Sequence, residues 1–190
     1  MPAPLFEVEG AKNQPTDQPP ADDLARLLAN LLGQSNTRSN ADATTRPAWD
    51  PRRVLLCTAE AHRNRVALQL TENGYQVFVA LDTRQAVERM RENRLDVVLL
   101  DPEFDVAEQG AAFVTREVNV LRPAQRRRLF LVLMSPNTRT MESHAAFLSN
   151  VNAIVNAKEL EQLPRILDHA LREYNELYKE FNVALNVAGL

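Results

Sequence analysis

Apolar and polar residues follow two spacings along this chain, and together they predict a regular succession of strands and helices. From residue 53 onward, short continuous apolar runs alternate with longer stretches whose apolar residues lie three and four positions apart. The first pattern is typical of strands buried on both faces, and the second is typical of amphipathic helices. The predicted strands are Val54–Cys57, Gln76–Ala80, Asp96–Leu100, Leu129–Met134 and Ala153–Asn156.

Helices are expected between these strands. We predict a helix at His62–Asn73 that ends at Gly74, a helix capped by Asp82, one at Thr138–Ser149 and a long closing helix at Leu163–Leu185. Strands that alternate with helices indicate an α/β fold. The expected architecture is a doubly wound, five-stranded parallel sheet of the flavodoxin-like type, with strand order 2-1-3-4-5, and any ligand would lie at the carboxyl ends of the strands.

The first part of the chain has a different composition. Seven of the eleven prolines fall within residues 1–52, which are also rich in Ser, Thr, Asn and Asp. We therefore expect a disordered, flexible arm at 1–52, an α/β domain at 53–160 and an extended last helix at 161–186. Within the arm, residues 21–33 carry leucines at helical spacing, which predicts a short amphipathic helix that docks in cis or on a partner: Leu24, Leu27, Leu28, Leu31 and Leu32.

Composition excludes several classes of protein. A single cysteine, Cys57, leaves no disulfide framework, and three scattered histidines form no metal-binding pair, so no metal and no cofactor are expected. The net charge of −3 argues against a nucleic-acid binder. No apolar run is long enough to span a membrane, and the start of the chain has no signal-peptide pattern, so we expect a cytoplasmic protein.

The expected strand ends carry a recognisable pair of residues. Asp101 follows the run VVLL, and Ser135 follows the run LVLM. With the strand–helix spacing of residues 53–175, these positions resemble the receiver domains of bacterial two-component response regulators. The resemblance implies that Asp101 stands at the position of the phosphate-accepting aspartate and Ser135 at the position of the switch residue. It also implies a place in phosphorelay signalling.

Other positions depart from the pattern of that family. Receiver domains hold Mg²⁺ with an acidic pair at the end of the first strand, where this chain has Cys57 and Thr58. Asn156 and Ala157 stand where the family has a lysine followed by a proline, and Lys158 comes two positions late. The chain therefore resembles a degenerate receiver, or pseudo-receiver. Asp101 then either caps a turn through nearby backbone N–H groups or, in an atypical working receiver, accepts phosphate with the help of Mg²⁺.

The last helix is the second informative segment. A helix of 23 residues would be roughly 35 Å long and would extend past a strand of roughly 17 Å. Tyr174, Leu177, Tyr178 and Phe181 would then form an exposed apolar patch for a protein partner, a second copy of the chain or the helix at 21–33, unless they fold back onto their own domain. The basic run Arg126–Arg128 is interpreted as a solvated loop or as a contact for an acidic partner.

These observations predict a protein that is not an enzyme. We expect a signalling or scaffolding adaptor that acts through protein–protein contacts. The alternative is a receiver that is phosphorylated on Asp101. A small α/β enzyme comes third, because the sequence has neither GxxxxGK[ST] nor a GxGxxG motif after the first strand.

Overall fold

A computed structural model describes residues 50–92, 94–185 and 188–190 of this 190-residue chain. The predicted helix at 21–33, with Leu24, Leu27, Leu28 and Leu31, lies outside the described residues.

Five parallel strands form one sheet with the order β2-β1-β3-β4-β5. This confirms the predicted fold class and strand order. Each strand lies within a residue or two of its predicted position. The central strands β1 and β3 are buried on both faces, as their unbroken apolar runs predict, whereas the edge strand β2 is partly exposed. The strands are β1 Arg53–Cys57, β2 Gln76–Val79, β3 Val97–Leu100, β4 Phe130–Ser135 and β5 Ala153–Asn156.

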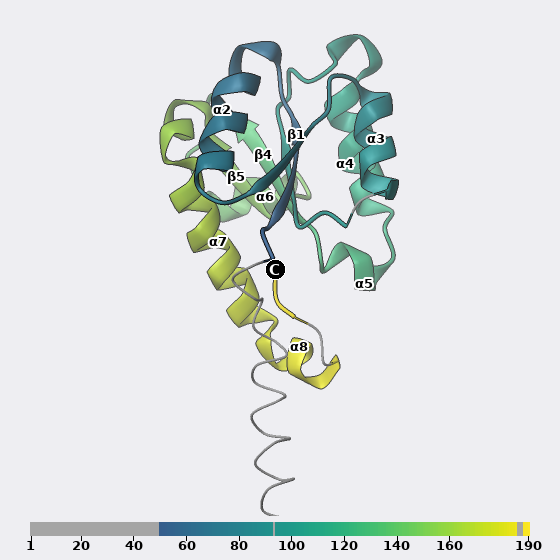
Figure 1. Cartoon of the computed structure of the whole chain (residues 1–190), viewed down its shortest axis with the longest axis vertical. Coiled ribbons are helices and arrows are strands. Elements are labelled where there is room, and N and C mark those ends of the chain that lie inside the picture. The colour runs from purple at the N-terminus through teal and green to yellow at the C-terminus, as the bar shows by residue number, and fades with distance from the viewer. Residues whose placement is uncertain (1–49, 93, 186–187) are drawn as a thin grey trace, which may run out of the picture. The chain divides into compact units, whose positions relative to one another are not determined.

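Helices cover both faces of this sheet (Figure 1). Helices α2 (Glu60–Glu72) and α7 (Leu163–Leu177), with the 3₁₀ segment η2 (Ala157–Gln162), pack on one face. Helices α3 (Thr83–Glu92), α4 (Gly110–Asn119) and α6 (Ser143–Leu148) pack on the other. The remaining short elements are η1 (Val106–Glu108), α5 (Pro123–Arg126) and α8 (Lys179–Leu185).

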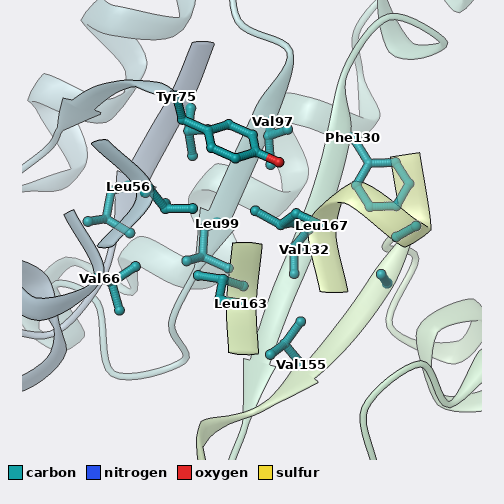
Figure 2. Packing of buried hydrophobic residues seen from close by; sticks show 14 of the residues in the cluster. Leu56, Val66, Tyr75, Val97, Leu99, Phe130, Val132, Val155, Leu163 and Leu167 are labelled. Carbon is teal, nitrogen blue, oxygen red and sulfur yellow. The ribbon is translucent and has the colours of Figure 1, made fainter. Parts of the chain in front are cut away.

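Alternate residues of each strand point into two separate cores. Val54 and Leu56 of β1 join the core under α2 and α7, whereas Leu55 and Cys57 join the core under α3, α4 and α6. Figure 2 shows the first core, in which Leu163 and Leu167 of α7 lie against the side chains of the central strands. Each fully buried side chain of this kind stabilises the fold by about 1.5–3 kcal/mol.

Two predicted helix ends are confirmed. Gly74 has a φ of +82°, a left-handed conformation that glycine adopts without strain, and it follows the end of α2. The Asp82 carboxylate accepts a hydrogen bond from the backbone N–H of Gln85 at 2.8 Å, which caps the start of α3.

The helix predicted at Thr138–Ser149 is too long, because α6 begins only at Ser143. The preceding residues are bonded to β5 instead. The Thr140 hydroxyl accepts the backbone N–H of Asn156 at 2.9 Å, and the N–H of Met141 donates to the carbonyl of Ile154 at 2.9 Å. Met141 also has a φ of +61°, which is incompatible with a helix.

The prediction of one continuous helix from Leu163 to Leu185 is wrong. The helix is interrupted at Tyr178, so α7 ends at Leu177 and α8 begins at Lys179 (Figure 1). The guanidinium of Arg127 lies 4.4 Å from the centre of the Phe181 ring, a cation–π contact that joins α8 to the loop before β4.

The basic run before β4 is not simply a solvated loop. Arg126 is half-buried, and its Nη1 atom donates to the Leu129 carbonyl and to Asn152 Oδ1, each at 2.9 Å. Burial lowers the pKa of the Arg126 guanidinium below its ordinary value. Arg126 and Arg127 therefore act inside the fold, where they hold neighbouring loops and α8.

Candidate functional site

The sequence-predicted site residues meet at the carboxyl edge of the sheet. Asp101 follows β3, the central strand, and its own backbone N–H donates to the carbonyl of Cys57 at the end of β1, at 2.8 Å. Ser135 and Asn156 are paired residues at the ends of β4 and β5. The parallel topology thus gathers side chains from four strands at one edge, as expected for an open α/β sheet.

Asp101 is buried, with 5% of its surface exposed, and both oxygens of its carboxylate have backbone partners. The N–H of Ala59 donates to Oδ2 at 3.2 Å, and the N–H of Glu103 donates to Oδ1 at 2.9 Å. These bonds join the loop after β1 to the loop after β3. The geometry is that of an aspartate that caps two turns through backbone N–H groups.

Cys57 and Thr58, at the position of the acidic pair, are both fully buried. Burial raises the pKa of the Cys57 thiol to about 12, so the side chain is neutral at physiological pH. The hydroxyl oxygen of Thr58 is buried and has no hydrogen-bond partner among the described residues. Neither side chain therefore brings negative charge to Asp101.

This set of donors does not fit Mg²⁺. Magnesium takes carboxylate and water oxygens in octahedral geometry, and the edge provides one carboxylate, a neutral thiol and a hydroxyl. Glu60, the next acidic residue after β1, is exposed in the first turn of α2. Across the described ranges, no cluster of three or more His, Cys, Asp or Glu side chains is placed to hold a metal ion.

Ser135 and Asn156 also have local partners. The Ser135 hydroxyl donates to Thr138 Oγ1 at 2.9 Å and accepts the backbone N–H of Thr138 at 3.1 Å. Asn156 Oδ1 accepts the N–H of Lys158 at 2.9 Å, and its Nδ2 donates to the carbonyl of Thr138 at 2.8 Å. Lys158 itself is exposed. Both side chains shape the turns after β4 and β5.

Sequence reasoning missed a junction that holds the loop after Asp101. Asp105 Oδ2 accepts the backbone N–H of Thr83 at 2.8 Å and the Thr83 hydroxyl at 2.5 Å. These hydrogen bonds to the charged form lower the pKa of Asp105 below its ordinary value of 3.8. Gly110 makes the close approach possible, since a Cβ there would lie 2.7 Å from Thr83 Oγ1. In the sequence, Gly110 was the residue that could have indicated this junction, because the domain has few glycines and a glycine permits close backbone approach.

The predicted patch on the last helix is only partly free. Tyr174 was predicted to be exposed on this patch, but it folds back onto its own domain. Its ring meets Phe130 edge-on at 5.2 Å, and its hydroxyl donates to the carbonyl of Arg127 at 3.1 Å. Its burial raises the pKa of the Tyr174 hydroxyl to about 12. Tyr178 lies between Tyr174 and Phe181, and Leu177 is 76% exposed while Phe181 is 37% exposed. The exposed part of the patch is therefore centred on Leu177.

No protein-family model matches the chain. No curated protein matches it either.

Solved structures do share its fold. The chemotaxis protein CheY4 of Vibrio cholerae matches 64% of this chain and 100% of its own, with 21% identity and a TM-score of 0.52. A signal receiver domain from Vibrio parahaemolyticus matches over 66% and 94% of the two chains, with 11% identity and a TM-score of 0.52. NtrX from Brucella abortus matches over 70% of this chain and 29% of its own, with 18% identity and a TM-score of 0.53. The chain thus has the fold of receiver domains.

Within the stretches that the structure describes, no helix is both long enough and apolar enough to cross a membrane.

Proposed function

We propose that the protein is a receiver-like signalling module that acts through protein–protein contacts and does not use Mg²⁺-dependent phosphorylation. The observation that supports this most is the neutral, buried pair Cys57 and Thr58 beside Asp101. Transfer of a phosphoryl group needs positive charge that compensates its oxygens. Without a second carboxylate to hold a metal ion, that compensation is missing.

The bonding of Asp101 supports the same proposal. Both carboxylate oxygens accept backbone N–H groups, from Ala59 and Glu103, so the side chain has a structural task at the edge of the sheet. Each of these hydrogen bonds stabilises the negative charge of the carboxylate, which makes the accepting oxygen a weaker nucleophile. The protein then transmits signals by binding, and the exposed Leu177 on α7 is a candidate contact residue.

One observation favours the second candidate, a working receiver. Asp101 stands at the end of the central strand, where the resemblance to receiver domains implies a phosphate-accepting aspartate. In that case Asp101 would become phosphorylated, and the turn held by Ser135 would respond.

Labelling with acetyl phosphate and MgCl₂, followed by intact-protein mass spectrometry, tests the proposal. The wild type is expected to gain no Mg²⁺-dependent adduct. The variant Cys57→Asp/Thr58→Asp, if circular dichroism shows it folded, is expected to gain one that the further change Asp101→Asn removes. A Mg²⁺-dependent adduct on wild-type Asp101 would reject the proposal in favour of the working receiver.

A second experiment examines binding. A partner cross-linked to the full chain should be lost from Leu177→Asp and retained by Leu68→Asp, a matched control because Leu68 is 61% exposed on α2. Equal capture by both variants would remove Leu177 from the interface.

A further inference from the structure

A pocket of about 510 Å³ opens at the amino edge of the sheet, the edge opposite Asp101. Its lining comes from the end of α3, the loop between α4 and α5, α5 itself and the segments just before β3 and β4. Leu95 and Leu129, which come just before β3 and β4, are buried at 7% and 6% exposure. Met90 and Leu121 are half-buried and complete an apolar floor. The volume falls within the roughly 300–1,000 Å³ that is usual for ligand pockets.

Arginines surround this floor. Arg91 and Arg94 are exposed, Arg128 is half-buried, and Glu92 is the one acidic residue of the lining, which leaves a local charge of +2 (three positive charges and one negative). The whole chain carries −3, so the lining of this pocket is opposite in sign to the net charge of the protein. Arg91 and Arg94 form no ion pair with any described residue, in contrast with Arg126 and Arg127, which act inside the fold.

We propose that this pocket binds an acidic peptide segment of a partner protein, with one large apolar side chain on the leucine floor and flanking carboxylates on the arginines. Arginine presents a planar fork of donors that matches a carboxylate, and the floor removes an apolar anchor from water. This inference rests on the proposed function, because it names the kind of partner that a binding module would take. It places that partner away from Asp101.

A peptide fits these features better than a nucleic acid. A phosphate backbone needs an extended basic surface, whereas this pocket offers three arginines around an apolar floor, with a carboxylate, Glu92, among them. The apolar floor also has no counterpart in a sugar–phosphate chain, but it suits a leucine or phenylalanine side chain.

Fluorescence polarisation of the full chain tests the proposal. The probe is a fluorescein-labelled peptide Gly-Glu-Asp-Leu-Phe-Asp-Glu-Gly. We expect Arg91→Glu/Arg94→Glu to weaken binding about tenfold or more, and the matched control Arg65→Glu, an exposed arginine on α2, to change it less than about twofold. Arg91→Gln/Arg94→Gln should give an intermediate loss. Thermal melts that coincide with wild type show that each variant is folded.

Two further probes separate the outcomes. A peptide with Ser-Gly in place of Leu-Phe should bind more weakly, and a single-stranded DNA of similar charge should compete poorly. Failure of the wild type to bind the acidic peptide, equal binding of the Ser-Gly peptide or tighter binding of the DNA would each overturn the proposal. The outcome is independent of acetyl phosphate labelling at Asp101, so failure here would leave the proposed function standing.

Discussion

Replacing Asp101 by alanine measures how much its carboxylate stabilises the folded protein. The change removes the acceptor for the N–H groups of Ala59 and Glu103, at an edge where Asp101 is only 5% exposed. A hydrogen bond to a charged group contributes about 1.5–3 kcal/mol. The variant also loses the cost of burying the charge, so the net effect is smaller than two such bonds. We expect a loss of about 2–4 kcal/mol in the free energy of unfolding.

Urea unfolding followed by circular dichroism provides the measurement. Asp101→Asn should lose less, about 1–2 kcal/mol, because its single carbonyl oxygen keeps one N–H partner while its amide group cannot accept the other. Glu103→Gln is the matched control, since Glu103 is exposed, and it should stay within about 0.5 kcal/mol of wild type.

The opposite result has a clear meaning. In a cluster of carboxylates, each negative charge repels the others, so removing one relieves repulsion and stabilises the fold. If Asp101→Ala or Asp101→Asn unfolds at the same or a higher urea concentration than wild type, the capping role assigned to Asp101 is refuted.

Three other predictions follow from the structure. Gly110→Ala should cost about 1–3 kcal/mol of stability in urea unfolding, because its Cβ would lie 2.8 Å from the Phe104 carbonyl oxygen, and an unchanged stability would show that the junction is loose. Asp105→Asn should be less stable than wild type at neutral pH. The pKa of Asp105 in the folded protein lies below its ordinary value of 3.8, so the charged carboxylate stabilises the fold above that pH. The difference in unfolding free energy between wild type and variant should therefore shrink as the pH falls below 3.8. A difference that does not depend on pH would contradict the assigned cause. Phe181→Ala should lose about 0.5–1 kcal/mol through its contact with Arg127, whereas Leu185→Ala, at a side chain that is 55% exposed, should change little, and equal effects would argue against the cation–π contact.

The sheet was predictable because its signals are local and repeated. A strand buried on both faces needs an unbroken apolar run, and VLLC and VVLL are such runs. Helix ends at Gly74 and Asp82 were predictable for the same reason, since a left-handed turn and a side-chain cap depend on one residue each.

The errors arise where distant contacts override local pattern. Residues 138–142 have helix-like spacing, but Thr140 and Met141 bond to β5 instead. The leucine and tyrosine stripe continues past Tyr178 in sequence, yet the helix breaks there, and Tyr174 and Phe181 contact Phe130 and Arg127 near β4. The contacts of Tyr174 and Phe181 join residues more than 40 positions apart, and the bonds to β5 join residues 13 and 16 positions apart. No local helical spacing encodes either kind of pairing.

For the site, sequence placed Asp101, Cys57, Thr58 and Ser135 at the correct edge of the sheet. It left open what Asp101 does, because the backbone N–H groups of Ala59 and Glu103 carry no signature in their side chains. The pocket at the opposite edge was also out of reach, since Arg91, Arg94 and Arg128 come together only after α3 and the segment before β4 have packed.

The most direct test of the central claim is an amide-resolved NMR titration of the full chain with MgCl₂ and beryllofluoride, a stable mimic of the phosphoryl group. The N–H signals of Ala59 and Glu103 report on Asp101, because both donate to its carboxylate. We predict that these two signals stay in place for the wild type and move for a folded Cys57→Asp/Thr58→Asp variant. Saturable movement of both signals in the wild type would contradict the claim that this receiver-like protein works without Mg²⁺ and phosphate.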